Sequence, residues 1–311
     1  MKLYMAPLEG ITGYIYRNAQ CEIFGGIDRY FSPFIDARLK RSLKSKELRD
    51  ILLENNPGVE LVPQIMSNNG EAFVKTIGQM QELGYTQFNL NLGCPSGTVV
   101  AKGRGSGFLS HPEALEHFFE EVFSLHDLKL SVKTRIGVEN PDEMERLLLI
   151  FNRFPLTELI VHPRIQKDFY KNKPNREVFA WIVRESANPV CYNGDIFTFQ
   201  DYEEFQREFP GVDRLMLGRG ILKNPALARM IKGGKRASKE ELREFHDRIY
   251  MRYRETLSGE KPVLYKMKEV WFYLIQSFEM HEKLSGELKK VQHLTEYEQM
   301  VRRIFAELEC L

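Results

Sequence analysis

The hydrophobic pattern of the first two thirds of the chain alternates between two periods. Short apolar runs rich in strand-forming residues recur, and longer stretches with one apolar face, typical of helices, lie between them. The eight expected strands are Leu3–Ala6, Arg29–Phe34, Leu61–Ile65, Gln87–Leu92, Leu130–Thr134, Leu159–Val161, Val190–Tyr192 and Arg214–Leu217. The clearest intervening helices are expected at Glu71–Leu83, Pro112–Leu125, Pro141–Phe154 and Phe199–Phe209.

This alternation predicts an α/β fold. Eight strands separated by helices over roughly 230 residues are typical of a parallel (β/α)8 TIM barrel. A doubly wound open sheet is the rival architecture. It usually has fewer strands, and no G-x-G-x-x-G motif follows the first strand here. The pattern therefore favours the closed barrel.

The pattern changes near Lys232–Lys235, beyond which no strand is expected. Ser238 is a suitable helix N-cap, and Glu241 three residues later completes a capping box. The expected helices are Lys239–Gly259, Val263–His281 and Gly286–Glu309. We therefore expect a TIM-barrel domain over residues 1–234 and a small all-helical domain over residues 235–311.

Bulk composition indicates a soluble intracellular protein. The net charge is +1 over 311 residues, so any contact with nucleic acid depends on a local basic patch. The four cysteines contain no C-x-x-C pair, which fits a reducing cytoplasm and neither a zinc site nor a disulfide framework. The start of the chain lacks a signal-peptide core, and apolar runs are too short to span a bilayer. We expect a cytoplasmic monomer without a metal or membrane partner.

The fourth expected strand leads into the most informative segment of the chain. Asn89–Leu92 alternates polar and apolar residues, and the strand ends at Gly93. Cys94 follows, and Pro95 after it disfavours a helical backbone at the cysteine. A glycine-rich loop, 102–107, comes next. A thiol beyond a strand end and beside such a loop indicates a pocket that uses a general acid or a nucleophile.

Most other chemically interesting residues also follow the carboxyl ends of expected strands. In a barrel these ends converge on the face where active sites lie. Each residue alone has an ordinary structural interpretation, but coincidence at six strand ends is much less plausible than a shared site. In chain order they are Pro7, Glu9, Gln64, Asn91, Cys94, Lys133, Arg135, His162, Arg164, Asn193, Gly194, Asp195, Gly218, Arg219 and Gly220.

The last two strands indicate the class of ligand. Asn193–Asp195 and Gly218–Gly220 place flexible backbone and one guanidinium where barrels usually bind phosphate. Gln64, Lys133 and His162 then supply an amide, a cation and an imidazole for the carbonyls and ring nitrogens of a flat heterocycle. A lysine beside a flavin also stabilises the anionic reduced ring. FMN, a flavin tethered by a phosphate, fits this pattern.

These motifs, in this order and spacing, resemble the tRNA-dihydrouridine synthases over essentially the whole chain. The matching segments are Ala6–Gly10, Gln64, Asn91–Pro95, Lys102–Gly107, Lys133–Arg135, Val161–Arg164, Asn193–Asp195 and Gly218–Gly220. The resemblance implies an FMN-binding barrel followed by a helical tRNA-binding domain. Leu8 stands where the family often has methionine, and Pro163 stands where it often has glycine, which affects the loop before Arg164.

The resemblance also implies a role for each residue. Pro7, Leu8 and Glu9 line the flavin, and Gln64, Lys133 and His162 hold its ring. Asn193, Gly194, Asp195, Gly218 and Arg219 hold the ribityl phosphate. Cys94 is the proton donor, and Asn91 and Arg164 orient the uracil or the flavin. Lys102 and Arg104 of the glycine-rich loop are candidates for contact with RNA.

The implied reaction reduces the C5–C6 double bond of a tRNA uridine to dihydrouridine. A hydride passes from N5 of reduced FMN to C6, and Cys94 protonates C5. A nicotinamide dinucleotide reduces the flavin transiently; NADPH is the family expectation, and the sequence does not choose it over NADH. Six basic residues are the expected phosphate contacts of the helical domain: Arg248, Arg252, Arg254, Lys261, Lys266 and Lys268.

Three alternatives remain open. An FMN-dependent barrel acting on a free pyrimidine such as dihydroorotate explains the flavin site but not the helical domain. A non-redox phosphate-binding barrel, such as a lyase or isomerase, explains the strand ends without a flavin. A flavin-free RNA-binding protein that kept the fold binds tRNA without reducing it.

Overall fold

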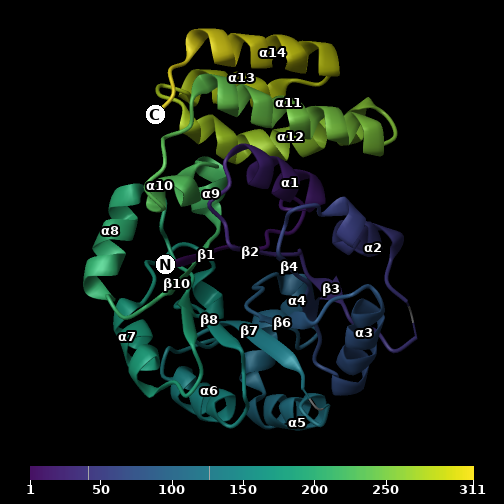
Figure 1. Cartoon of the computed structure of the whole chain (residues 1–311), viewed down its shortest axis with the longest axis vertical. Helices are drawn as coiled ribbons and strands as arrows, with labels where there is room; N and C mark the ends of the chain where they lie inside the picture. Colours follow the sequence, from purple (N-terminus) through teal and green to yellow (C-terminus); the bar gives the residue numbers. More distant parts are fainter. Residues whose placement is uncertain (41, 126) are drawn as a thin grey trace.

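The strands curl into one parallel barrel with helices around it (Figure 1). The computed structural model describes residues 1–40, 42–125 and 127–311. Within those ranges the sheet consists of ten segments, all paired in parallel. They are β1 (Lys2–Met5), β2 (Arg29–Phe31), β3 (Ile35–Asp36), β4 (Leu61–Val62), β5 (Gln64–Met66), β6 (Gln87–Leu92), β7 (Lys129–Arg135), β8 (Glu158–His162), β9 (Val190–Tyr192) and β10 (Arg214–Leu217).

Prolines interrupt two of the eight expected strands, and the second segment of the strand expected at Arg29–Phe34 lies just beyond that range. Pro33 lies between β2 and β3, and Pro63 separates β4 from β5. Proline has no N–H for a ladder hydrogen bond, so regular pairing breaks at both places. β2 pairs with β4 and β3 pairs with β5, while β1 joins β2 to β10, so the sheet closes on itself. The predicted TIM barrel is confirmed.

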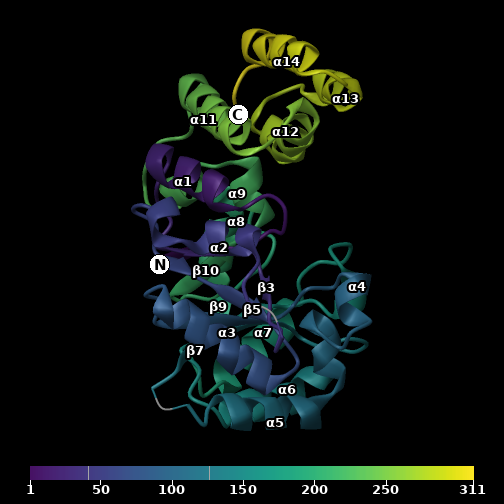
Figure 2. The ribbon, with the colours of Figure 1, turned by 90° about the vertical axis from the view of Figure 1, so that its right-hand side faces the viewer.

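Most of the barrel helices surround the sheet, while α4 (Gly97–Val100) lies at its mouth (Figure 1). They are α1 (Tyr14–Ile23), α2 (Ser45–Ile51), α3 (Gly70–Glu82), α4 (Gly97–Val100), α5 (Pro112–Val122), α6 (Glu143–Asn152), α7 (Arg176–Glu185), α8 (Phe199–Glu208), α9 (Arg219–Lys223) and α10 (Leu227–Ile231). Short 3-10 turns are η1 (Leu53–Asn55), η2 (Gly105–Ser110), η3 (Gln166–Asp168) and η4 (Ile275–Ser277). Figure 2 shows α4 on the side of the barrel opposite the N-terminus.

Side chains alternate between the two faces of each strand, so the outer face of the sheet is apolar and the inner face is partly polar. On β6, Phe88, Leu90 and Leu92 pack in the outer core, whereas Asn89 and Asn91 alternate with them. A small apolar cluster closes the barrel interior below the polar residues; it consists of Tyr4, Ala6, Phe31, Val62, Ile160, Cys191 and Met216. The polar interior groups at the carboxyl ends of the strands are therefore the ones left for a ligand.

The C-terminal segment is helical, as expected. It comprises α11 (Lys239–Thr256), α12 (Glu260–Leu274), α13 (Glu282–Lys290) and α14 (Leu294–Glu307). The predicted capping box is confirmed: Ser238 Oγ accepts from the Glu241 N–H, and the Glu241 carboxylate accepts from the Ser238 N–H. No described helix is long and apolar enough to cross a membrane.

The single helix predicted for Gly286–Glu309 is wrong, because two helices occupy this region. Gly286 lies inside α13, which ends at Lys290. The Lys268 ammonium donates to the backbone carbonyls of Lys289 and Val291, so it satisfies acceptors that a helix end leaves without partners. The Glu296 carboxylate accepts from the Gln292 N–H before α14 starts. These caps stabilise a break that hydrophobic spacing did not indicate.

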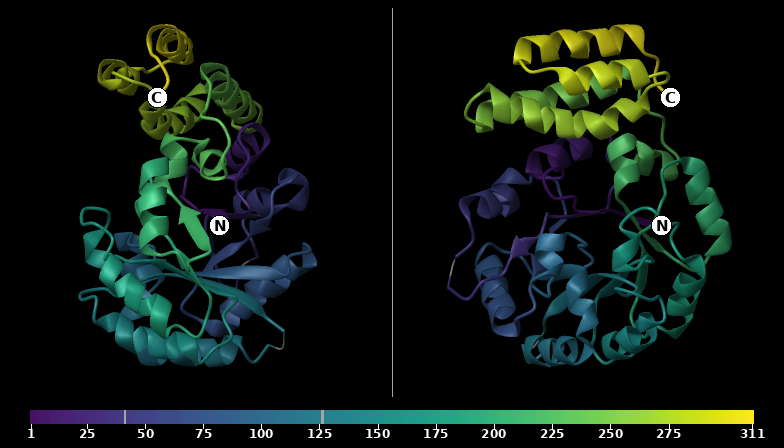
Figure 3. Two further views of the ribbon diagram at one scale, coloured as in Figure 1. Left: turned by 60° about the vertical axis from the view of Figure 1, so that its left-hand side comes forward. Right: turned by 180° about the vertical axis from the view of Figure 1, so that it is seen from behind.

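The helical segment packs on α1 and α10 of the barrel (Figure 3). Phe245 of α11 makes edge-on contacts with Tyr16 and Phe24, at ring-centroid distances of 5.2 and 5.4 Å. Arg229 of α10 binds the Glu241 carboxylate through two hydrogen bonds of 2.6 and 2.8 Å. An apolar contact and a bidentate ion pair therefore hold α11 against the barrel.

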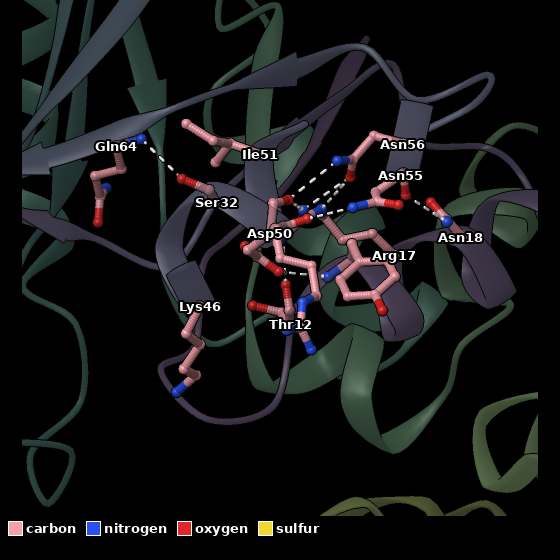
Figure 4. A network of polar contacts seen from close by, with 12 residues as sticks. Thr12, Arg17, Asn18, Ser32, Lys46, Asp50, Ile51, Asn55, Asn56 and Gln64 are labelled. Atoms are coloured by element: carbon pink, nitrogen blue, oxygen red, sulfur yellow. Dashed lines mark hydrogen bonds and ion pairs between the residues drawn. The ribbon is translucent and has the colours of Figure 1, made fainter. Parts of the chain in front are cut away.

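A buried arginine fixes α2 and η1 against α1 near the mouth of the barrel (Figure 4). Arg17 is fully buried and donates to Asp50 Oδ2 at 3.1 Å and to Asn56 Oδ1 at 2.8 Å. It also donates to the backbone oxygens of Thr12 and Asp50. A buried guanidinium is tolerated only when its donors are satisfied. The network thereby sets the position of α2 relative to the loop after β1.

Candidate active site at the barrel mouth

A chain of amide side chains crosses the barrel interior beneath the mouth. Gln64 of β5 donates to Asn89 Oδ1 at 2.7 Å and accepts from Asn91 Nδ2 at 2.6 Å. Asn91 Oδ1 in turn accepts from the backbone N–H groups of Gly93 and Cys94, both at 3.0 Å. Gln64 is fully buried. The two residues expected to face the cofactor and the uracil thus share one hydrogen-bond network with the cysteine backbone.

Cys94 is the second residue after the end of β6 and is half-buried. Burial raises the pKa of its thiol above the ordinary value, and the Ser96 backbone and the Arg135 charge offset this only in part. The thiol is therefore protonated at neutral pH. A protonated thiol is suited to donate a proton and poorly suited to act as a thiolate nucleophile.

Lys133 and Arg135 lie two residues apart on β7, so both side chains are on the inner side of the barrel. Lys133 is directly opposite Asn91 in the β6–β7 ladder. Burial, followed by the nearby Arg135 charge, lowers the pKa of Lys133 to about 8. Across the described part of the chain, no hydrogen bond or ion pair engages its ammonium. A cation with this pKa and without an anionic partner indicates a site for an anionic or electron-rich ligand.

His162 ends β8 among several positive charges. Burial lowers the pKa of His162 well below 6.5, and Lys133, Arg135, Arg164 and Arg219 lower it further. Arg164 Nη1 lies 3.0 Å from His162 Nε2 and can only donate, so Nε2 accepts and the ring proton is at Nδ1. The imidazole is therefore neutral, with Nδ1–H as its remaining donor.

Asp195 connects the two arginines of the mouth. It pairs with Arg164 at 2.5 Å and with Arg219 at 2.6 Å. Burial alone would raise the pKa of this carboxyl, but hydrogen bonds and charge from Arg164, together with Arg219, hold it below its ordinary value. One carboxylate therefore partly neutralises two guanidinium groups. It leaves the mouth with excess positive charge from Lys133, Arg135, Arg164 and Arg219.

Glycines after strands β9 and β10 allow neighbouring groups of the protein to lie close to the backbone. A side chain at Gly220 would lie 2.0 Å from the Ile196 carbonyl oxygen, and one at Gly194 would lie 2.0 Å from the Tyr192 hydroxyl. Asn193 Nδ2 donates to the Met216 carbonyl at 2.8 Å, which ties the two strands together. Gly218 precedes α9 and lies beside Ala6 of the first strand end. The segments expected to hold a phosphate are thus adjacent.

The loop after β1 reaches from this mouth toward the helical segment. Leu8 packs against both the inner and the outer apolar clusters, which anchors Pro7 and Glu9 around it. Burial raises the pKa of Glu9. Lys266 of α12 donates to the Gly10 carbonyl at 2.7 Å, so the loop contacts both parts of the molecule.

A cleft of about 700 Å³ opens beside the mouth. Its walls come from the loop after β1, the connection from β3 through α2, the loop after β6, the end of α11 and Lys266 of α12. Of the residues assigned from sequence, Glu9, Lys102, Arg104 and Lys266 line it. Cys94, Lys133 and His162 are not among its lining residues. Val99 connects the cleft to the surroundings of Cys94. It lines the cleft, and it contacts Gly105, which lies against Cys94.

The structure places the two basic residues of the glycine-rich loop differently. Lys102 is exposed on the cleft wall. Arg104 is turned toward the protein, where it pairs with the Asp36 carboxylate and donates to Asn68 Oδ1 at 3.2 Å. Arg164 is 2% exposed and also donates to the Asn172 carbonyl, so its guanidinium is largely engaged within the protein.

The structure gives contacts that the sequence did not indicate to Arg135, which the sequence analysis placed at the barrel mouth, and to Tyr170. Arg135 donates to the carbonyls of Gly93, Ile165 and Phe169 and so joins the loops after β6 and β8. The Tyr170 ring lies 4.5 Å from the Arg219 guanidinium and 5.8 Å from the His162 ring. No sequence signal indicated that Tyr170 covers the phosphate-side arginine.

The expected phosphate contacts of the helical segment are mostly occupied within the protein. Arg248 pairs with Glu22 and Glu244, Arg252 with Glu255, and Arg254 with Glu298. Lys266 pairs with Glu269 and binds the Gly10 carbonyl, and Lys268 caps α13. Among the described residues, no group of three or more His, Cys, Asp or Glu side chains could hold a metal ion.

The closed parallel barrel and its cationic mouth define a TIM-barrel protein with a candidate ligand site at the carboxyl ends of its strands. The family model described as dihydrouridine synthase (Dus) matches residues 4–309. The chain therefore belongs to the dihydrouridine synthase family. This match confirms the family and the class of enzyme, an oxidoreductase, that the motifs predicted.

Individual relatives agree with the family match. The protein named tRNA-dihydrouridine(16) synthase from Aquipseudomonas alcaligenes is 29% identical over 238 residues, which cover 74% of this chain and 75% of that protein. The probable tRNA-dihydrouridine synthase 2 of Bacillus subtilis is 29% identical over 227 residues, covering 71% and 69%. Among solved structures, the old yellow enzyme from Trypanosoma cruzi has a TM-score of 0.53 at 10% identity, covering 77% of this chain and 91% of that one. This last likeness shows the fold.

Proposed function

We propose that this protein is an FMN-dependent tRNA-dihydrouridine synthase that reduces the C5–C6 double bond of specific uridines in tRNA. The observation that carries the proposal is the grouping of a protonated thiol, Cys94, with Lys133, a neutral His162 and Arg219 at one barrel mouth. These groups match the acid, the ring contacts and the phosphate contact that flavin-dependent uridine reduction needs. The family membership supports the same reaction.

The residues of the mouth fit FMN. A dianionic phosphate suits the segment around Gly194, Gly218 and Arg219, where backbone approaches closely and a guanidinium is available. A flat ring with carbonyls suits the Gln64 amide, the Lys133 ammonium and the His162 Nδ1–H. Lys133 lacks an anion partner among the described side chains, and such a ligand supplies one. Pro7, Leu8 and Glu9 line the remaining side.

The protein's own contribution to the reaction is positioning and proton supply. FMN, when bound and reduced by a nicotinamide dinucleotide, supplies the hydride for C6 of the base. Lys133 and His162 would stabilise negative charge that develops on the ligand at the mouth. The Cys94 Sγ–H donates the proton to C5, and solvent restores that proton afterwards. Asn91, which holds the Cys94 N–H, fixes the start of the loop that carries the thiol.

The cleft between the barrel and the helical segment is the proposed entry for the tRNA. A stacked uridine must be flipped out to reach the mouth, at a cost of a few kcal/mol. We assign residues 1–234 to catalysis and residues 235–311 to tRNA binding together with the cleft wall of the barrel. Lys46, Arg49 and Lys102 line the cleft. Within the described chain their only side-chain ion pair is the long one from Lys46 to Glu9, at 3.9 Å.

Replacing Arg49 and Lys102 together by glutamine is expected to weaken binding of unmodified tRNA. The two cations face the cleft without partners in the described structure, so each can neutralise a phosphate and release a counterion. The slope of log affinity against log salt concentration is expected to become shallower by about 0.7 to 0.9 for each lost contact. Filter binding or fluorescence titration over a range of salt concentrations measures it.

Arg252→Gln is the matched control, because that side chain is exposed and already paired with Glu255. It is expected to leave the slope nearly unchanged. If Arg252→Gln reduced this slope as much as the Arg49 and Lys102 replacements do, the helical segment, and not the cleft wall, would provide the phosphate contacts.

The function itself is tested by mapping dihydrouridine in tRNA from cells with and without this protein, using mass spectrometry. Loss of dihydrouridine at one or a few positions, restored by the wild-type chain, supports the proposal. A purified protein that binds FMN and reduces a free pyrimidine but no tRNA supports the dihydroorotate-type alternative. A protein that binds no FMN under any condition contradicts both.

A further inference from the structure

We infer that the ion pair between Arg104 and Asp36 is a latch that positions the Cys94 thiol. The inference rests on the proposed function for its catalytic consequence, but the latch itself is a property of this chain. It makes Arg104 and Asp36 positioning residues. It replaces the expectation that the Arg104 side chain contacts RNA.

The latch joins the glycine-rich loop to two strand ends of the barrel. Arg104 Nη1 pairs with Asp36 Oδ1 at the end of β3, and Arg104 Nε donates to Asn68 Oδ1 after β5, at 3.2 Å. Asn68 Nδ2 returns a hydrogen bond of 3.0 Å to the Lys102 carbonyl. The side chains of Arg104 and Asp36 are only 22% and 18% exposed. A pair this sheltered, with a second hydrogen bond on the same guanidinium, is held more firmly than a surface ion pair.

Asp36 also binds a second arginine. Arg38 Nε donates to Asp36 Oδ2 at 2.8 Å, on the oxygen that Arg104 does not use. Each arginine therefore has its own oxygen of the carboxylate, and the contact to Arg104 does not need the contact to Arg38. Among the described residues, no hydrogen bond or ion pair joins Arg38 to Arg104, so the two arginines bind Asp36 separately.

The residues directly after Arg104 hold the Cys94 backbone. The Ser106 N–H and Oγ both donate to the Cys94 carbonyl, at 3.1 and 2.9 Å. Gly105 adopts a left-handed conformation with φ of +55°, and a side chain there would lie 2.8 Å from the same carbonyl oxygen. The fit between Gly105 and Cys94 is therefore tight. A shift of Arg104 moves the two residues that fix the cysteine.

The Cys94 backbone is thus held by a strand residue at its N–H and by loop residues at its carbonyl. On one side Asn91, within β6, accepts from the Cys94 N–H at 3.0 Å. On the other side the Cys94 carbonyl depends on Gly105 and Ser106, and their loop is tied to β3 and β5 through the latch. A displacement of about 1 Å in a reacting group can cost about a hundredfold in rate. The latch is therefore a place where a remote ion pair controls the proton donor.

A double-mutant cycle on the full-length protein tests the latch. The variants are Arg104→Gln, Asp36→Asn and the double variant, with Arg104→Lys as the conservative replacement. Arg38→Gln is the matched control, because it removes the other guanidinium from Asp36 and leaves the latch. Thermal melting establishes that each variant is folded. Two measurements follow: alkylation of Cys94 by iodoacetamide, resolved by peptide mass spectrometry, and kcat and KM for uridine reduction in tRNA.

We expect each single latch variant to alkylate Cys94 several-fold faster, while Cys21 and Cys310 in the same sample react at the wild-type rate. We expect kcat to fall about tenfold with KM nearly unchanged, since positioning and not binding is lost. The double variant is expected to be no worse than either single variant, because both remove the same interaction. Arg104→Lys recovers part of kcat, and Arg38→Gln behaves like the wild type.

Other outcomes overturn the latch. Unchanged Cys94 alkylation in all variants shows that the loop does not depend on the ion pair. A higher KM at unchanged kcat in Arg104→Gln, absent from Asp36→Asn, shows that Arg104 binds RNA phosphate instead. If alkylation responds as expected but even the wild type reduces no tRNA uridine, the latch stands and the proposed function fails.

Discussion

Replacing Cys94 by alanine is expected to slow uridine reduction in tRNA by about 10² to 10⁴-fold, the usual contribution of a positioned general acid. FMN binding and flavin reduction by the nicotinamide are expected to remain nearly intact, because the thiol is not among the groups assigned to the cofactor. Anaerobic stopped-flow kinetics separates the two half-reactions. The reductive half-reaction is measured as oxidation of NADPH by the enzyme. The oxidative half-reaction is measured as reoxidation of the reduced flavin by tRNA.

The Cys94 result needs controls for fold and for chemistry. Cys21→Ala removes another half-buried thiol, one whose Sγ lies 3.6 Å from the Gly58 carbonyl, and is expected to change neither half-reaction. Cys94→Ser keeps a donor of similar size that is a far weaker acid, so it is expected to resemble the alanine variant. A normal rate of uridine reduction by Cys94→Ala would mean that another group supplies the proton.

The pH dependence of the Cys94 step has a definite sign. Burial raises the pKa of this thiol, so it stays protonated throughout the neutral range. The oxidative half-reaction should therefore be flat near neutral pH and fall only on the alkaline side, as the thiol ionises. A rate that instead rises with pH through the neutral range contradicts a proton-donating role.

Much of the barrel was predictable because its determinants are local. The two-residue period of β6 is visible within a short window of sequence, and so are the glycines after the strand ends. These local signals located the strands and the face of the barrel that carries the candidate site. The strand breaks at Pro33 and Pro63 were readable in principle, since proline cannot complete the ladder. The break between α13 and α14 was not, because Lys268 from another helix caps it.

The candidate site was predictable as a set of residues but not as a set of contacts. Chain order placed Arg104 in the glycine-rich loop, and only the three-dimensional approach of β3 reveals that Asp36 binds its guanidinium. The six basic residues of the helical segment read as free charges in sequence. Arg248, Arg252 and Lys266 each pair with a glutamate three or four positions away, which helix spacing makes predictable. Arg248 also pairs with Glu22, 226 positions away, and no local pattern encodes that contact.

Replacing Lys133 by methionine is expected to separate the function of this side chain from its cost in stability. Burial and the Arg135 charge lower the pKa of the ammonium to about 8 from an ordinary value of 10.5. The folded protein therefore disfavours the charged form. Its stability is greatest above the unfolded-state pKa, declines as pH falls from about 10.5 to 8, and is constant below that range.

At neutral pH Lys133→Met should thus melt a few degrees above the wild type in the ligand-free state, and the difference should shrink as pH rises from 8 toward 10. Lys129→Met is the matched control, because Lys129 is exposed at the opposite end of the same strand. It is expected to leave both the melting temperature and its pH dependence nearly unchanged.

The same substitution should weaken the function strongly. An anionic ligand stabilises the Lys133 ammonium, so FMN binding to the wild type should take up a proton near pH 8 to 9 and weaken as pH rises through that range. Lys133→Met should lose this pH dependence and slow flavin reduction by about 10²-fold, since a desolvated charge beside the cofactor is lost. Isothermal titration in buffers of different ionisation enthalpy measures the proton uptake directly. Equal proton uptake by the wild type and Lys133→Met would place this ammonium away from the cofactor, whatever the rate of turnover.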